Sequence, residues 1–215
     1  MSKVMIPKAS KSTWRKYYCF DGVKVFEFLI RGNIFFGVSL LGSGTAINSC
    51  GGTGGGGSTL TLQPTDDSYV RDGSGANKNY GSATVMNVKT DSIENNRHTY
   101  LKFYLTGVSS RASAKLRIYG DASYNTTLTA YETGASWSES TVTRNNKLAS
   151  GNMVGSVFMN NTKTYYEIIL TAYTAAQLAG NKALSIVLRE DAGKYITLNS
   201  SENSTNRPEL VITQN

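Results

Sequence analysis

The sequence predicts an all-β protein, a single jelly-roll-like β-sandwich that follows an N-terminal leader and a glycine-rich linker. Short strand-like runs recur through residues 59–214, and turn residues separate them. About 155 residues remain after the linker, a common size for one sandwich with its own core. Both cysteines, Cys19 and Cys50, precede this region, so the sandwich can hold neither a disulfide nor a thiolate site.

Residues 1–50 are typical of an export leader. A short apolar run at 34–41 follows Arg31 and is followed by small polar residues up to Cys50, which is the order of an export signal. The run is too short to span a bilayer comfortably. The ending Ile47-Asn48-Ser49-Cys50 resembles a bacterial lipobox, so Cys50 is the candidate lipidation site. The long stretch before the apolar run leaves three alternatives open: a start codon placed too far upstream, an unusually long leader, and a non-functional or mispredicted N-terminal extension.

Residues 51–58 form a Gly-rich linker. Such linkers behave as flexible coil and hold a domain away from its anchor. We therefore expect an exported protein at the cell surface, lipid-anchored through Cys50, or an extracellular one. Contact with a membrane is expected only through the lipid anchor, and the sandwich is expected to be a monomer.

Eleven strands are expected after the linker. In chain order they lie at 59–62, 68–70, 85–89, 99–105, 114–119, 126–131, 156–158, 165–170, 183–189, 195–198 and 209–213. One short helix is expected at 172–179, because Gly180 is a good C-terminal stop. Pro64 and Pro208 stand near the two ends of the domain, where a missing amide donor is tolerated.

Three of these strands carry basic and aromatic side chains opposite their apolar ones. Side chains alternate with period two along a strand, so one face is buried and the other is displayed. The displayed face is expected to carry Asn87 and Lys89 in the first strand, Tyr100, Lys102 and Tyr104 in the second, and Lys115, Arg117 and Tyr119 in the third. If these strands share a sheet, that face suits an acidic polymer.

The formal net charge of +7 resides mostly in the leader. Residues 1–50 hold seven basic and two acidic side chains, whereas residues 51–215 hold fifteen basic and thirteen acidic ones. Binding of a polyanion by the sandwich therefore requires local clustering. The interval from Arg71 to Arg117 supplies it, with eight basic and three acidic residues.

An ordered set of motifs resembles a known family. The segments are TDDSYVRDG at 65–73, NKNYG at 77–81, NR at 96–97, YLKF at 100–103, AKLRIY at 114–119, WSESTVT at 137–143 and RPELVI at 207–212. Together they resemble the DNRLRE-type β-sandwich domains, to which carbohydrate-binding module family 96 belongs. The chain departs from that pattern at Arg144, where an aromatic residue is usual, at Ile169, where Asp is common, and at Ser201, where Arg often precedes the Glu.

The resemblance implies a noncatalytic module that binds an acidic polysaccharide, with alginate as the leading ligand. Lys and Arg on neighbouring strands can meet successive carboxylates of a polyuronate, Arg through bidentate hydrogen bonds. The expected ligand-binding residues are Arg71, Lys78, Lys89, Arg97, Lys102 and Arg117, with Tyr100 and Tyr104 as sugar-stacking candidates. The alternative is that these charges only keep a sheet soluble and that the tyrosines are ordinary strand formers.

Metal and catalytic chemistry find less support. Asp66, Asp67 and Asp72 are weak calcium candidates, because Ca²⁺ takes oxygen ligands but Asp-rich turns are common without metal. No other cofactor is expected. The sole histidine, His98, is interpreted as a surface residue and Trp137 as a packing residue. Since no spacing singles out a catalytic set, we expect no enzyme.

Two further functions remain open. One is a structural or adhesive module of the cell envelope without a sugar ligand, and the other is a polysaccharide lyase, whose Tyr, His and Arg or Lys residue types are all present. Nucleic acid is not an expected partner, because an exported protein seldom meets it.

Overall fold

A computed structural model describes the backbone of residues 15–20, 25–31 and 34–40, and the backbone and side chains of residues 58–91, 94–109 and 113–214. The chain divides into two compact units, Met1–Gly56 and Gly57–Asn215. In the first unit, strands β1 (Arg15–Phe20), β2 (Val25–Arg31) and β3 (Ile34–Leu40) form an antiparallel sheet in that order. Cys50 and the glycine tract up to residue 57 lie outside the described residues, and the export leader stays a prediction.

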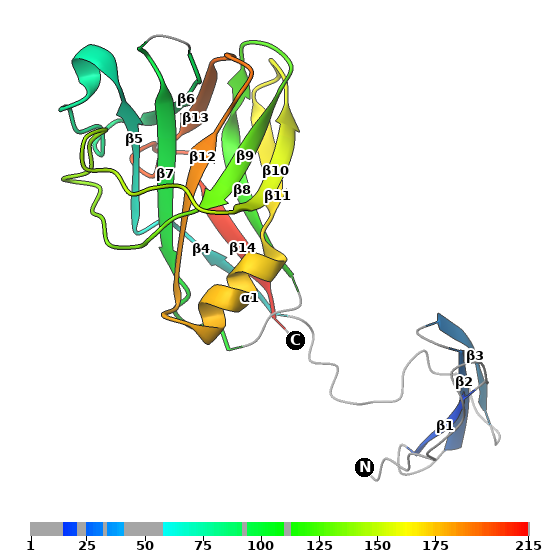
Figure 1. Ribbon diagram of the computed structural model, residues 1–215. Helices are drawn as coiled ribbons and strands as arrows, with labels where there is room; N and C mark the ends of the chain where they lie inside the picture. Colours follow the sequence, from blue (N-terminus) through cyan, green and yellow to red (C-terminus); the bar gives the residue numbers. More distant parts are fainter. Residues whose placement is uncertain are drawn as a thin grey trace. The chain divides into compact units, whose positions relative to one another are not determined.

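The second unit confirms the predicted all-β sandwich. Eleven strands form two antiparallel sheets that face each other (Figure 1). The first sheet has the order β10-β9-β12-β7-β5. Its strands are β5 (Asp66–Arg71), β7 (Arg97–Tyr104), β9 (Thr126–Glu132), β10 (Met153–Met159) and β12 (Ala183–Arg189).

The second sheet is organised around the long strand β8 (Ser113–Ala122). β11 (Thr164–Ile169) pairs along one edge of β8, and β14 (Glu209–Thr213) and β13 (Ile196–Asn199) pair along the other. β4 (Thr59–Leu62) then pairs with β14, and β6 (Val85–Val88) with β13. A short 3-10 helix, η1 (Gly73–Gly75), follows β5. The helix α1 (Thr171–Ala179) ends at Gly180, as predicted. Among the described residues, no helix has the length and apolar character needed to cross a bilayer.

The main core lies between the two sheets and follows the predicted alternation. In β8, Leu116 and Ile118 are fully buried, whereas Lys115, Arg117 and Tyr119 are partly exposed. In β7, Leu101 and Phe103 enter the same core. The period-two pattern therefore assigns the inner face of both sheets correctly.

The outer face of the first sheet is covered by a loop. Residues 133–152, which we call the covering loop, connect β9 to β10, and Figure 1 shows this yellow-green segment crossing in front of β7. Val142 from the loop packs with Val70, Tyr100 and Val187 of the sheet, and Trp137 packs against this second apolar cluster. Trp137 Nε1 also donates a hydrogen bond to Ser185 Oγ at 2.9 Å, which fits its predicted packing role.

Candidate functional site

Three basic side chains lie side by side where β7 begins. Arg71, the last residue of β5, is paired directly with Arg97, the first residue of β7. Arg97 forms an isolated bridge with Lys89, the residue after β6. Residues directly opposite in antiparallel strands project to the same side, and like charges placed so destabilise the pairing. We call these three residues the cationic row.

The cationic row has few negative neighbours. Arg71 Nη2 donates to the Asn95 side-chain oxygen at 2.7 Å, and Arg97 Nη1 donates to the Asn95 carbonyl oxygen at 3.0 Å. Lys89 Nζ lies 2.6 Å from an Asp91 carboxylate oxygen. Among the ion pairs of the described residues, Asp91 is therefore the one acidic partner of three cations. In addition, Arg71 Nε is buried without a hydrogen-bond partner.

Tyrosine rings accompany the cationic row. The Arg97 guanidinium lies 5.2 Å from the ring centroid of Tyr195, and the rings of Tyr69 and Tyr80 stack with centroids 4.3 Å apart. Burial and the neighbouring Tyr80 raise the pKa of Tyr69, so its phenol stays neutral. Tyrosines combine a flat apolar face with a polar hydroxyl. Such rings beside cations can contact both the ring and the substituents of a sugar.

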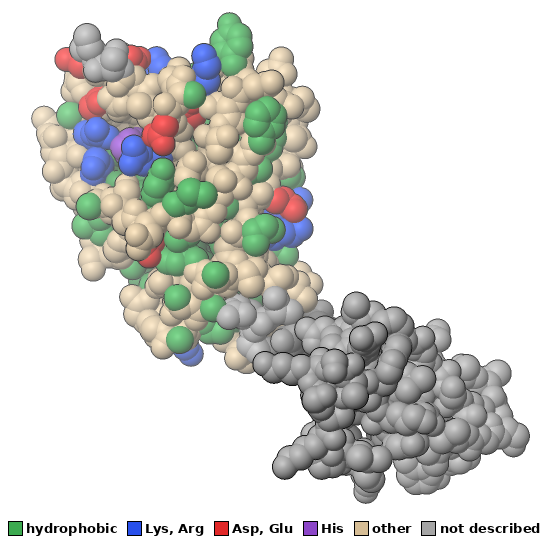
Figure 2. Space-filling view, turned by 45° about the vertical axis from the view of Figure 1, so that its right-hand side comes forward, with side chains coloured by type: hydrophobic (Ala, Val, Ile, Leu, Met, Phe, Trp, Pro, Cys, Tyr) green, Lys and Arg blue, Asp and Glu red, His purple; other side chains and the backbone are tan. Residues whose placement is uncertain are grey.

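A second cationic group lies on the opposite side of β7. His98 follows Arg97, and alternation turns its side chain to the outer face of the sheet. Arg144 Nη1 lies 3.5 Å from His98 Nδ1. Because Leu188 pairs with Thr99, the next residue of β12, Arg189, comes beside His98. We call His98, Arg144, Lys147 and Arg189 the His98 cluster. Figure 2 shows blue Lys and Arg side chains gathered around the purple side chain of the chain's only histidine.

The electrostatics of the His98 cluster indicate excess positive charge. Burial, then Arg144, Arg189 and Lys147, lower the pKa of His98 to about 4. Burial and the same two arginines lower the pKa of Lys147. Arg189 Nη2 donates to Asp191 Oδ1 at 3.2 Å, and Arg144 lies 3.8 Å from Asp72. Among the ion pairs of the described residues, none involves Lys147, so the cluster keeps an excess of positive charge. An anion bound here would relieve the mutual repulsion of the cations.

The structure brings together only part of the predicted binding set. Arg71, Lys89 and Arg97 form the cationic row, and Lys78 is exposed after η1. Arg117 lies on β8, in the other sheet, where its guanidinium is 2.6 Å from Glu209 and 3.3 Å from Glu167. It also stacks over Tyr165 at 4.2 Å. Arg117 is therefore satisfied within the protein and separate from the row.

The expected exposure of Lys102 and Tyr100 is wrong, because the covering loop buries the outer face of β7. Lys102 is 5% exposed, and its Nζ lies 2.9 Å from Asp66 Oδ2 and donates to the Trp137 carbonyl oxygen at 2.6 Å. Tyr100 is 1% exposed, and its hydroxyl donates a hydrogen bond to the Leu148 carbonyl oxygen at 2.8 Å. Both residues hold the loop to the sheet. Tyr104, by contrast, is 48% exposed at the far end of β7.

Sequence reasoning missed most of the His98 cluster. Arg144 and Lys147 belong to the covering loop and Arg189 to β12, and nothing local to these segments indicates that they meet. The replacement of a usual aromatic residue by Arg144 was the one available signal. His98 itself is half-buried between cations, so its interpretation as an ordinary surface residue needs correction.

The three calcium candidates have different environments. Asp66 pairs with Lys102, and Asp72 accepts hydrogen bonds from the backbone and side-chain nitrogens of Asn96, both at 2.7 Å. Only Asp67 meets other carboxylates, those of Glu139 and Glu202. Asp66, Asp67 and Asp72 therefore do not come together as one group of candidate calcium ligands.

The described part of the chain is a two-sheet β-sandwich that displays cations beside tyrosines where β7 begins. The chain belongs to carbohydrate-binding module family 96, whose profile matches residues 58–214. The resemblance in the sequence is thereby confirmed, and membership implies a polysaccharide partner. A gellan lyase from Bacillus sp. is 31% identical over 170 residues, which cover 73% of this chain and 7% of the lyase. The chain thus spans a small part of that relative's length.

Proposed function

We propose that this chain is a noncatalytic module that binds an acidic polysaccharide, with alginate as the leading ligand, at the cationic row and the His98 cluster. The observation that carries the proposal is the row itself. Arg71, Arg97 and Lys89 stand in register across neighbouring strand segments. Among the ion pairs of the described residues, Lys89 alone of the three has an acidic partner, Asp91. Arg97 and His98 are consecutive, so both cationic groups lie at the start of β7.

The chemistry of a polyuronate fits this arrangement. Such a polymer carries one carboxylate per sugar, and several cations near one strand end can meet carboxylates in succession. Arg contributes bidentate hydrogen bonds, whereas Lys acts as a point charge. Each exposed ion pair contributes roughly 0–1 kcal/mol, so affinity requires several contacts together. It should fall as salt rises, because exposed charges are screened over about 8 Å at physiological ionic strength.

Two observations support a noncatalytic role. The gellan lyase match aligns with only 7% of that protein, which fits an accessory module better than the reacting part. In addition, the pKa of His98, at about 4, makes its imidazole a weak general base at neutral pH. Export, a lipid anchor at Cys50 and a monomeric state complete the proposal. A tethered module of this kind would capture polysaccharide for enzymes encoded elsewhere.

The proposal is tested by affinity electrophoresis of the full chain through gels that contain alginate, a neutral glucan or nucleic acid. We expect alginate alone to retard the protein, and the retardation to fade as salt rises. Retardation by no acidic glycan would favour a structural or adhesive module of the cell envelope. Equal retardation by nucleic acid would reduce the site to a general polyanion surface.

A second measurement on the same samples addresses catalysis. A lyase releases unsaturated sugars, which absorb in the ultraviolet. We expect no rise in absorbance when the protein is incubated with alginate. A steady rise would assign an enzymatic function to the chain and contradict the noncatalytic part of the proposal.

A further inference from the structure

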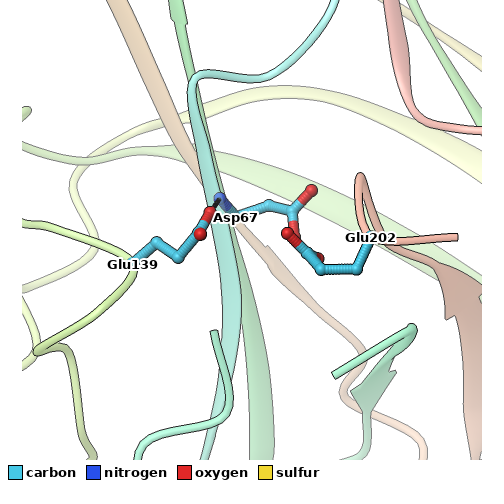
Figure 3. A group of neighbouring side chains, drawn as sticks. All are labelled: Asp67, Glu139 and Glu202. Carbon is cyan, nitrogen blue, oxygen red and sulfur yellow. Dashed lines mark hydrogen bonds between the residues drawn. The ribbon is translucent and has the colours of Figure 1, made fainter. Parts of the chain in front are cut away.

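Three carboxylates from distant parts of the sequence meet at the edge strand β5. Asp67 belongs to β5, Glu139 to the covering loop, and Glu202 to the turn after β13. One carboxylate oxygen of each lies within 4.8 Å of the others. Figure 3 shows the Asp67 and Glu202 carboxylates close together, with the Glu139 carboxylate at the Asp67 backbone nitrogen, which donates to Glu139 Oε2 at 3.0 Å. We call these residues the acidic trio.

The acidic trio contains oxygen atoms that the protein leaves unused. Asp67 is 1% exposed, and its Oδ2 accepts a hydrogen bond from the Ser201 amide at 2.8 Å. Its other oxygen, Oδ1, is buried and has no hydrogen-bond partner, and the same holds for Glu202 Oε2. An unpartnered buried carboxylate oxygen is costly. Two such oxygens in one group of acids point to a bound species, such as a cation, that both oxygens can contact.

In the described part of the chain, no cation forms an ion pair with the acidic trio. Among the ion pairs of the described residues none involves Asp67, Glu139 or Glu202, and the nearby Lys102 is paired with Asp66. Ser201 occupies the position where the family pattern often has Arg, so no guanidinium is supplied there. Burial, and then the charge of Glu202, raise the pKa of Asp67 to about 7. Burial also raises the pKa of Glu139.

We propose that Asp67, Glu139 and Glu202 form a binding site for a divalent cation, specifically Ca²⁺. Three carboxylates are hard oxygen ligands, and Ca²⁺ takes six to eight oxygens in flexible geometry. Mg²⁺ requires a near-ideal octahedron of closer ligands, which three side chains from three separate segments are less suited to provide. Water and further oxygens would complete the shell of the Ca²⁺ ion.

The site gives Ca²⁺ a structural role. It joins β5, the covering loop and the turn that carries Ser201 and Glu202. At this point two hydrogen bonds join Glu139 to β5 and one joins Ser201 to Asp67. The covering loop also carries Arg144 and Lys147. Ca²⁺ binding therefore stabilises the fold and fixes the segment that supplies two members of the His98 cluster.

The test is thermal unfolding of the full chain without glycan, after treatment with a chelator and then in CaCl₂ or MgCl₂. A Ca²⁺ concentration about 100 times the dissociation constant should raise Tm by roughly 5–10 °C. MgCl₂ should raise it less. Because no polysaccharide is present, failure here is distinct from failure of polysaccharide binding.

Two variants of the acidic trio and one control make the test specific. Asp67→Asn keeps an oxygen that can accept from Ser201 but removes a charge, so it should fold without metal and lose most of the Ca²⁺ shift. Glu202→Gln should behave alike, and Asp121→Asn, on β8, should keep the full shift. The proposal is overturned if CaCl₂ leaves the Tm of the unaltered protein unchanged. It is equally overturned if the two trio variants gain as much from Ca²⁺ as the unaltered protein does.

Discussion

Arg71 lies directly opposite Arg97 where β5 pairs with β7, so two guanidinium groups are cross-strand neighbours at one end of the sandwich. The hydrogen bonds of both arginines go to Asn95, a neutral residue, and not to a carboxylate. A pair that served stability alone would place opposite charges here. The pair therefore lowers the folding stability a little and concentrates positive charge at the surface.

This relationship predicts that stability and binding respond differently to one substitution. In Arg71→Gln the cross-strand repulsion disappears, so the free energy of unfolding should stay within about 0.5 kcal/mol of its original value or rise. Retardation by alginate should decrease. Urea unfolding and affinity electrophoresis measure the two effects. A loss of stability well above about 1 kcal/mol would show that Arg71 is mainly a structural residue.

The buried ion pair of Lys102 predicts a large loss of stability, in contrast to the small effect expected for Arg71→Gln. Lys102→Ala leaves Asp66 without its cation and the Trp137 carbonyl without its donor. The expected cost is about 3–5 kcal/mol of unfolding free energy, measured by guanidinium unfolding. The control is Lys115→Ala, whose partly exposed pair with Glu167 should contribute no more than about 1 kcal/mol. Equal, small losses in both variants would contradict the buried role of Lys102.

The contrast between Lys102 and Lys115 shows what local sequence patterns can and cannot predict. Period-two alternation placed all eleven strands and correctly separated the two faces of β8. It cannot tell whether the second face of a strand meets water or another segment. For β7 that second face is buried by the covering loop, which lies more than thirty residues further along the chain. In the sequence of this loop, Trp137 and Val142 were the residues that indicated an apolar side.

His98 predicts a loss of stability in acid. Arg144, Lys147 and Arg189 lower its pKa and Asp72 raises it, and the folded protein holds the imidazole neutral down to about pH 4. The unfolded chain takes up that proton near its ordinary pKa of about 6.5. Because the unfolded state then binds more protons, the free energy of unfolding should fall from about pH 6.5 towards pH 4, by at most about 3 kcal/mol.

The variant that isolates this contribution is His98→Gln, which has no group that titrates in that range. Urea unfolding of both proteins between pH 4 and pH 7 gives the comparison, and carboxylates elsewhere contribute equally to each. The difference in unfolding free energy between the two proteins should shrink or reverse on acidification. A difference that is independent of pH would mean that His98 is not held neutral by its neighbours.

The His98 cluster also shows why the site was only partly predictable. The cationic row consists of residues at strand ends within one region of the sequence, so a count of local charge finds it. Arg144 and His98 are 46 residues apart and belong to a loop and a strand. Their contact follows from the fold of the covering loop, and no periodicity of either segment encodes it.

A bound polyuronate should change the titration of His98. A carboxylate placed among Arg144, Lys147 and Arg189 offsets the positive charge that lowers the pKa of His98. NMR titration is simple because the chain has one histidine. We expect the pKa of His98 to rise from about 4 when alginate is added. With a neutral glucan it should remain at about 4. If alginate binds and leaves this titration unchanged, the His98 cluster is not part of the binding surface.

The most direct test of the proposed function compares two double variants that each lose two positive charges. Arg71→Gln/Arg97→Gln alters the cationic row, and Lys115→Gln/Arg117→Gln alters the other sheet. Titration of each full-length protein with alginate oligosaccharides by calorimetry at fixed salt gives the dissociation constants. The first variant should bind about tenfold more weakly, which is about 1.4 kcal/mol, and the second should bind like the unaltered protein. Equal weakening of both, or unchanged binding by the first, would contradict the cationic row as the binding surface.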